Sequence, residues 1–186
     1  MLAKRSFVAL AVALTVALPA VASIKAMTLR ELMSITSGAV HGTVVARETV
    51  QRGFPQSGAV YTLLTIRGES VRTGEPTEVT VAFHGSHEVA DRYTISEMPT
   101  LQDTRIGAEV VAFFNPRKEL DGSPVIFDYS GIYRVERAFD KPVLMGKGEG
   151  FAFDKNEALD VVRQRVRQVH QEQLVAKQKL KLGTGK

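Results

Sequence analysis

Two histidines and a glutamate lie close together in the segment His84-Gly85-Ser86-His87-Glu88. Neutral imidazole and carboxylate groups suit zinc or nickel, so His84, His87 and Glu88 form a candidate ligand-binding or metal-binding set. Their spacing differs from the H-E-x-x-H and H-x-x-E-H motifs, and the segment supplies three ligands with no fourth nearby. The alternative, which we favour, is a solvated loop that carries two histidines. We therefore predict no resident metal and no cofactor.

Other catalytic arrangements find little support in the chain. Ser86 lies between the two histidines, but the G-x-S-x-G motif of a nucleophilic serine is missing. Glu88, Asp91 and Glu97 could supply paired carboxylates, although any polar loop offers such a trio. The Gly146–Gly150 segment lacks the G-x-x-x-x-G-K-[ST] frame of a phosphate-binding loop. A metal-dependent or hydrolytic enzyme that uses the loop from His84 to Glu97 remains the alternative to a non-enzymatic protein.

These residues follow a series of predicted strands. The sequence Thr28-Leu29-Arg30-Glu31 has the form of a capping box and predicts a short helix over residues 29–35. Alternating apolar and polar residues predict strands over 39–50, 59–70, 78–84, 109–114, 125–129 and 132–136. Residues 85–107 are expected to form a long loop, and residues 142–150 an irregular connection. In the first strand, one face is expected to hold Val40, Gly42, Val44 and Ala46, and the other His41, Thr43 and Arg47.

A long amphipathic helix is predicted to begin at an N-cap at Asp154, with Glu157 completing the cap. Leu159, Val162, Val166 and Val169 form its apolar stripe. Residues 151–186 carry a net charge of +4, whereas residues 23–150 carry −2. We favour packing of this stripe on the strands, and a peripheral contact of residues 154–182 with an anionic membrane is the alternative. The acidic body, whose aromatic residues occupy core-like positions, argues against a nucleic acid as the partner.

Residues 1–22 have the form of a signal peptide. Lys4 and Arg5 precede an apolar run that ends before Pro19, and small residues follow at the expected cleavage site. The run is too short for the roughly 20 residues that span a bilayer. Cleavage is therefore predicted between Ala22 and Ser23, with export to the periplasm or the exterior. Later in the chain, charged residues recur too often for a membrane-spanning segment.

The chain has 186 residues, of which 44% are hydrophobic and 24% charged, as in an ordinary globular protein. The absence of cysteine excludes disulfide scaffolds, thiolate metal sites and thiol nucleophiles. We expect a signal peptide (1–22), a β-barrel domain (23–150) and a C-terminal helix with a frayed basic tail (151–186). Five or six curved strands suit a mainly-β, OB-like Greek-key barrel, with a two-sheet sandwich as the competing architecture.

Short motifs along residues 28–137 support this fold. They are Thr28-Leu29-Arg30-Glu31-Leu32, Gly42-Thr43-Val44, Tyr61-Thr62, Val79-Thr80-Val81, His84-Gly85, Pro99, Gly107, Val110-Val111-Ala112-Phe113-Phe114 and Gly131-Ile132-Tyr133-Arg134-Val135. In this pattern the chain resembles a family of uncharacterised secreted bacterial proteins with a TIMP-like (netrin-module-like) OB barrel. The resemblance implies the fold and lends no catalytic residue. Metalloproteinase inhibitors of this fold present an N-terminal cysteine to zinc, and this chain has no cysteine.

Taken together, these features predict an exported, non-enzymatic binding or interaction module of the periplasm or cell envelope. Its ligand is expected to be a protein or a small molecule of the envelope.

Overall fold

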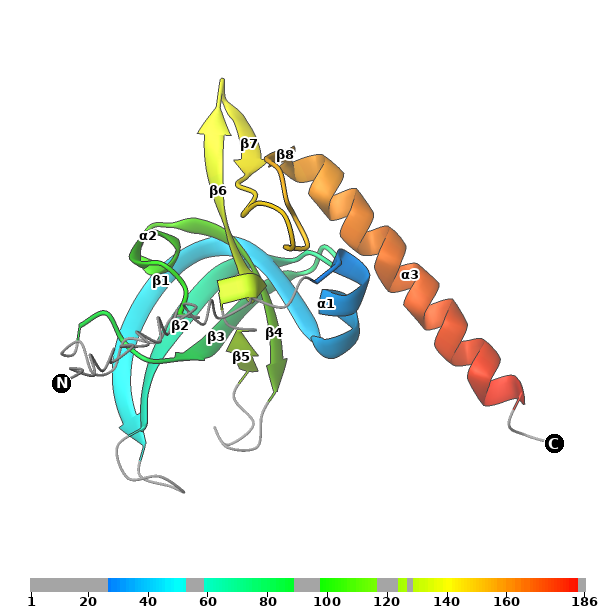
Figure 1. Cartoon of the computed structure of the whole chain (residues 1–186), viewed down its shortest axis with the longest axis horizontal. Coiled ribbons are helices and arrows are strands. Elements are labelled where there is room, and N and C mark those ends of the chain that lie inside the picture. The colour runs from blue at the N-terminus through cyan, green and yellow to red at the C-terminus, as the bar shows by residue number, and fades with distance from the viewer. Residues whose placement is uncertain (1–26, 53–58, 89–97, 117–123, 127–128, 184–186) are drawn as a thin grey trace, which may run out of the picture.

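A computed structural model describes residues 27–52, 59–88, 98–116, 124–126 and 129–183 (Figure 1). The predicted signal peptide, with its cleavage site at Ala22 and Ser23, lies outside these residues, as do Asp91 and Glu97. The elements are α1 (Leu29–Ile35), β1 (Gly38–Arg52), β2 (Ala59–Ser70), β3 (Pro76–His84), α2 (Leu101–Thr104), β4 (Glu109–Pro116), β5 (Pro124–Ile126), η3 (Tyr129–Gly131), β6 (Ile132–Ala138), β7 (Lys141–Leu144), β8 (Glu157–Ala158) and α3 (Leu159–Gly183).

The strands are hydrogen-bonded in the order β1-β2-β3-β5-β4-β6-β7-β8, and β4 pairs in addition with β1. Neighbouring strands run antiparallel, except that β3 and β5 are joined by one parallel pair, Ala82 with Val125. A mainly-β fold with a short N-terminal helix and a long C-terminal helix is thus confirmed. The number of strands exceeds the five or six that were expected, because β7 and β8 add a second ladder beyond β6.

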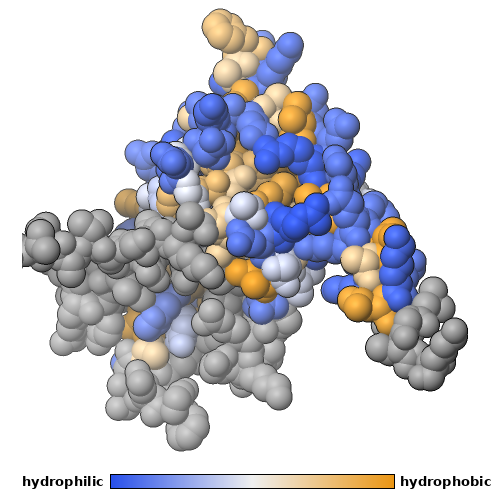
Figure 2. Space-filling view, turned by 45° about the vertical axis from the view of Figure 1, so that its right-hand side comes forward, coloured by the Kyte–Doolittle hydropathy of each residue, from blue (hydrophilic) through white to orange (hydrophobic). Residues whose placement is uncertain are grey.

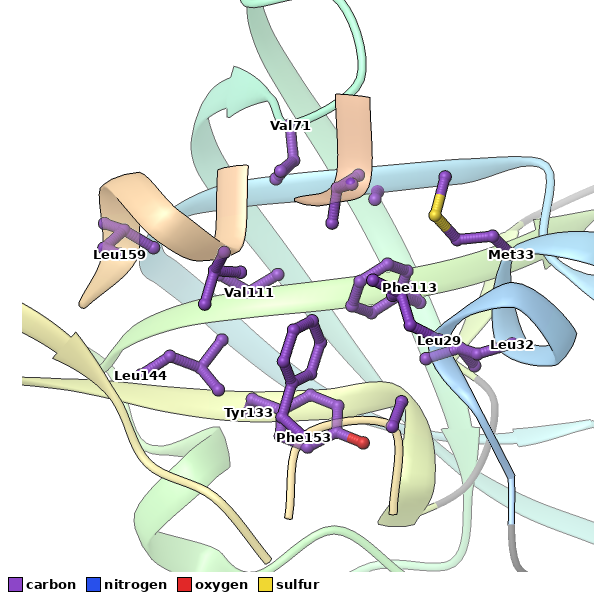
Figure 3. Close-up of a cluster of buried hydrophobic side chains, with 14 of the residues drawn as sticks. Leu29, Leu32, Met33, Val71, Val111, Phe113, Tyr133, Leu144, Phe153 and Leu159 are labelled. Atoms are coloured by element: carbon purple, nitrogen blue, oxygen red, sulfur yellow. The ribbon is translucent and has the colours of Figure 1, made fainter. Parts of the chain in front are cut away.

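Strand β4 is buried on both faces, which explains its nearly continuous apolar sequence. Val110 and Ala112 belong to an inner cluster, whereas Val111 and Phe113 belong to an outer cluster (Figure 3). The inner cluster consists of Val40, Val44, Leu64, Ile66, Val81, Phe83, Met98, Ala108, Val110, Ala112 and Ile132. The outer cluster consists of Leu29, Leu32, Met33, Ala39, Val71, Val111, Phe113, Tyr133, Val135, Leu144, Ala152, Phe153, Leu159, Val162 and Val166. Helices α1 and α3 therefore cover the outer side of the strands.

A register shift in β1 changes which of its side chains point inward. Val44 pairs with Ile66, but the next pair is Ala46 with Thr65, so Val45 is an extra, bulged residue. Beyond the bulge Arg47 pairs with Leu64, a fully buried residue of the inner cluster. Side chains of directly paired residues lie on the same face of a sheet. The expectation that Arg47 shares a face with His41 is therefore wrong, because the bulge turns Arg47 inward.

The start of the N-terminal helix α1 was predicted correctly, but the start of the C-terminal helix α3 was not. At α1 the capping box is present: the Thr28 hydroxyl accepts from the Glu31 amide, and the Glu31 carboxylate accepts from the Thr28 amide. The predicted start of the long helix at Asp154 is wrong. Glu157 and Ala158 pair with β7 as β8, and α3 begins only at Leu159. Glu157 instead accepts two hydrogen bonds from Arg165, one of them at 2.6 Å.

Helix α3 packs on the strands along only part of its length. Leu159, Val162 and Val166 are buried, as the predicted stripe requires. The remainder extends away from the strands and exposes Leu174 and Val175 (Figure 1). On this free end hydrophobic and hydrophilic residues lie side by side (Figure 2). Within the described part of the chain, no helix is both long and apolar enough to cross a membrane.

Candidate functional site

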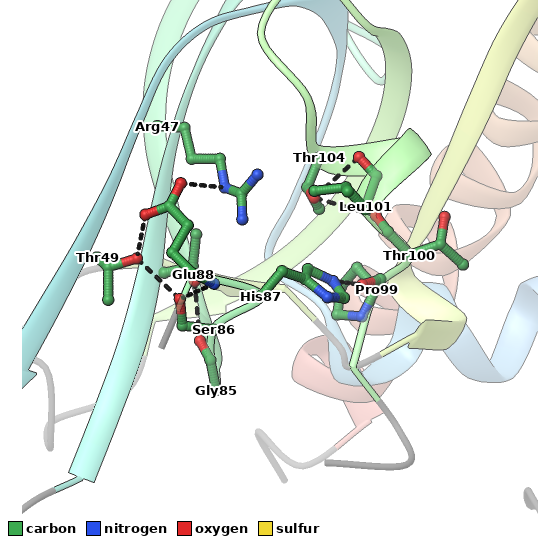
Figure 4. A network of polar contacts seen from close by, with 11 residues as sticks. Arg47, Thr49, Gly85, Ser86, His87, Glu88, Pro99, Thr100, Leu101 and Thr104 are labelled. Carbon is green, nitrogen blue, oxygen red and sulfur yellow. Dashed lines mark hydrogen bonds and ion pairs between the residues drawn. The ribbon is translucent and has the colours of Figure 1, made fainter. Parts of the chain in front are cut away.

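The three residues singled out in the sequence each have a different partner. The exposed His84 ring lies against Tyr61, with 5.1 Å between ring centroids. His87 Nε2 lies 2.8 Å from the carbonyl oxygen of Pro99. Glu88 instead contacts β1, through Thr49 and Arg47 (Figure 4). In the described residues, no group of three or more His, Asp or Glu side chains is placed to hold a metal ion.

The segment Gly85–Glu88 is fixed to the inner side of β1 and β2 by hydroxyl groups. Thr49 donates to Glu88 Oε2 at 2.9 Å, and Thr49 Oγ1 also lies 2.9 Å from Ser86 Oγ. Because a hydroxyl has one proton, Ser86 is then the donor to Thr49. Ser86 in turn accepts from the Glu88 amide at 3.0 Å, and Thr62 donates to the Gly85 carbonyl at 2.8 Å. These bonds form a continuous polar network at one end of the inner cluster.

Arg47 is the basic member of this network. Its side chain is 9% exposed, and its Nε lies 3.6 Å from Glu88 Oε1, an ion pair too long for a hydrogen bond. Two of its buried nitrogens, Nε and Nη2, have no hydrogen-bond partner in the parts of the chain that the structure describes. Burying an unsatisfied donor costs about 1–3 kcal/mol, so this end of the strands is destabilised unless an acceptor is supplied.

A second polar cluster lies on the outer side of β1, where α3 crosses it. His41 Nε2 lies 2.9 Å from Glu109 Oε1, and its Nδ1 lies 2.9 Å from Arg163 Nη2. Since Arg163 can only donate, Nδ1 is the acceptor and the neutral ring carries its proton on Nε2. Arg163 is also paired with Glu69. These residues line a pocket of about 470 Å³ between β1, β2 and α3. Because its charged groups are already paired with one another, the cluster acts as a link between α3 and the strands.

A third cluster surrounds Lys147, which lies after β7. Its ammonium group lies 3.4 Å from the centroid of the Tyr129 ring and 5.1 Å from that of Tyr133. It donates a hydrogen bond to the Tyr129 carbonyl oxygen. Burial lowers the pKa of Lys147 to about 8, against the opposing influence of Asp103. Burial also raises the pKa of both tyrosines. The contacts of Lys147 are with aromatic rings and a backbone carbonyl, which join η3 to the segment after β7.

Sequence reasoning missed Arg47 and His41 for different reasons. The adjacent Val44 and Val45 interrupt the alternation of β1, and this pair was the available signal for the bulge. The partner of His41 is 122 residues away, so no local pattern could indicate their contact.

The fold and its clusters define a mainly-β protein with a buried polar network at one end of its strands and a helix fastened across their outer side. In comparisons with known proteins, no family model, curated protein or solved structure matches the chain.

Proposed function

We propose that the protein is an exported, non-enzymatic binding module of the periplasm or cell envelope, built on an OB-like barrel. The ring of pairings β1-β2-β3-β5-β4, with β4 returning to β1, supports the barrel. The single parallel pair between β3 and β5 is what a small Greek-key barrel of this kind requires at its seam. This is also the fold implied by the resemblance to TIMP-like secreted proteins.

The observation that carries the binding function is the inward-facing polar network of Arg47, Thr49, Thr62, Ser86 and Glu88. The ends of small β-barrels are common ligand sites, where a few polar groups fix the orientation of a ligand. This network lies at such an end, next to the apolar inner cluster, and it contains buried donors that need an acceptor. The pocket beside His41 is a weaker candidate, because His41 and Arg163 are already hydrogen-bonded there, whereas two nitrogens of Arg47 have no hydrogen-bond partner among the described residues.

A binding experiment can use two matched threonines of β2. Thr62 is buried and points inward, whereas Thr65 pairs with Thr80 on the outer side. The isotope-labelled mature protein would be titrated with the small-molecule fraction of an envelope extract and followed by NMR. We expect saturable shifts at the amides of Thr49 and Ser86, weakened by Thr62→Val and unchanged by Thr65→Val. Shifts of equal size in the wild type and in both variants would contradict the proposed site. A complete lack of shifts would also contradict it.

Export has its own test. Expression of the full chain in a bacterium, followed by mass measurement of the protein in the periplasmic fraction, should give a product that begins at Ser23. A product retained in the cytoplasm with residues 1–22 intact would refute the proposed localisation.

Metal analysis of the same material addresses the enzyme alternative, since a tightly held stoichiometric ion would contradict a pure binding module.

The free end of α3 supports a second candidate, a peripheral membrane contact through residues 154–182. Leu174 and Val175 are exposed there, and Lys177 and Lys179 follow on the same free segment. Apolar side chains beside lysines favour binding to anionic lipid surfaces. Flotation with vesicles of phosphatidylglycerol would test this contact. Flotation that is absent, or that is unchanged after Leu174→Asn and Val175→Asn, would exclude it.

A further inference from the structure

The two unpartnered nitrogens of Arg47 lie along one edge of its guanidinium group. The N–H bond of Nε and one of the two N–H bonds of Nη2 point in the same direction, because the group is planar. Both are buried, and neither has a hydrogen-bond partner among the described residues. Buried polar side-chain groups in proteins are nearly always hydrogen-bonded, so a whole unfilled edge points to an acceptor that the described residues do not supply.

The shape of this edge indicates the chemistry of the acceptor. Two parallel N–H groups of an arginine match the two oxygens of a carboxylate, which they bind in a bidentate manner. An ammonium or a neutral carbonyl cannot use both donors in this way. The unfilled edge of Arg47 therefore fits a ligand with an oxyanion group, either a carboxylate or a phosphate. The Glu88 carboxylate, which already lies beside Nε, favours a carboxylate.

Glu88 lies beside this edge without filling it (Figure 4). Its Oε1 is 3.6 Å from Arg47 Nε, while its Oε2 accepts a hydrogen bond from Thr49. The Glu88 side chain is 54% exposed, so it can move away from Arg47 into solvent. Arg67, an arginine of β2, differs in both respects: it is largely exposed, and its Nε already donates to Glu78 at 2.5 Å.

We propose that Arg47 binds the carboxylate of a small ligand and that Glu88 is an internal competitor for the same edge. The inference rests on the proposed binding function and names the ligand class for that site. It predicts opposite effects for two neighbouring substitutions: loss of the Arg47 charge abolishes binding, and loss of the Glu88 charge strengthens it.

Acetate is the probe, because it is the smallest stable carboxylate. The Nε–Hε signal of Arg47 would be followed by NMR during titration of the mature protein with sodium acetate, with sodium chloride holding the ionic strength constant. We expect a saturable shift in the wild type and about tenfold tighter binding in Glu88→Gln, since a nearby like charge is removed. Arg47→Gln should abolish the acetate-dependent shifts at Thr49 and Ser86. Arg67→Gln, the matched control, should leave them unchanged.

An Nε–Hε signal that does not respond to acetate, or equal acetate affinity in the wild type and Glu88→Gln, would overturn the inference. Both of these proteins keep Arg47, so this comparison decides the question even where Arg47→Gln fails to fold. If the Ser86 amide shifts with the envelope extract but not with acetate, the proposal of a carboxylate ligand is refuted. The proposed binding function is then still supported. If neither the envelope extract nor acetate causes shifts, the carboxylate ligand and the binding function are both refuted.

Discussion

The partly buried Lys147 leads to a quantitative prediction about stability and pH. Its ammonium group is surrounded by the rings of Tyr129 and Tyr133, and burial lowers its pKa to about 8. In the unfolded chain the same lysine has an ordinary pKa near 10.5. We predict that the free energy of unfolding rises as the pH increases from 7 to 9.

The sign and size follow from proton binding. Between the two pKa values the folded protein has lost the Lys147 proton while the unfolded chain still holds it, so raising the pH favours the folded state. Integrated from pH 7 to pH 9, this difference amounts to about 1.3 kcal/mol. The raised pKa of each tyrosine acts in the opposite direction, but only when tyrosines of the unfolded chain ionise near pH 10. Among the described residues with a shifted pKa, Lys147 is therefore the one that titrates between pH 7 and 9.

Urea unfolding at pH 7, 8 and 9 measures this effect. The wild type should gain stability over the series, and Lys147→Met should show little change, because methionine keeps the length of the side chain without its charge. Lys155→Met is the control, since Lys155 is exposed, and it should keep the slope of the wild type. A slope that persists in Lys147→Met, or a flat wild type, would show that Lys147 does not titrate near pH 8.

Three further predictions test the fold. Phe139→Asn should stabilise the protein by about 1 kcal/mol in thermal unfolding, because Phe139 is fully exposed with a φ of 50°, a conformation that asparagine tolerates better. Gly68→Ala should destabilise it by about 1–3 kcal/mol in urea, since the new Cβ would lie 2.0 Å from the carbonyl oxygen of His41. Leu159→Ala should cost about 2–5 kcal/mol, whereas Val161→Ala, on the exposed side of α3, should cost less than about 0.5 kcal/mol. Equal effects of the last two would contradict the packing of α3.

Local patterns were sufficient where local interactions decide the structure. The capping box at Thr28 depends on residues three apart, and the buried stripe of α3 depends on helical spacing alone. The bounds of β2 at residues 59 and 70 were likewise predicted from alternation and flanking turn residues. In each case neighbouring residues supply both the signal and the interaction that it predicts.

Prediction failed where distant pairing overrides a local preference. Glu157 resembles part of a helix cap, yet its backbone pairs with Leu144 of β7. The β6–β7 hairpin was missed because Phe139 and Asp140 form its turn, both at positive φ, in place of the usual asparagine or glycine. The same limit applies to the candidate site. The segment at residues 84–88 was identified from the sequence, but its partners on β1 were not.

The bulge at Val45 determines which chemistry β1 can support. Before the bulge, His41 points outward and accepts a hydrogen bond from Arg163 of α3. Beyond it, Arg47 points inward, whereas strict alternation would leave Arg47 on the outer face and turn Glu48 toward the inner cluster. A shift of one residue exchanges the faces of a strand, so the buried arginine exists only because of this irregularity. Since an outward Arg47 would be hydrated and would need no partner, the proposed carboxylate site follows from the register of β1 rather than from the composition of the loop.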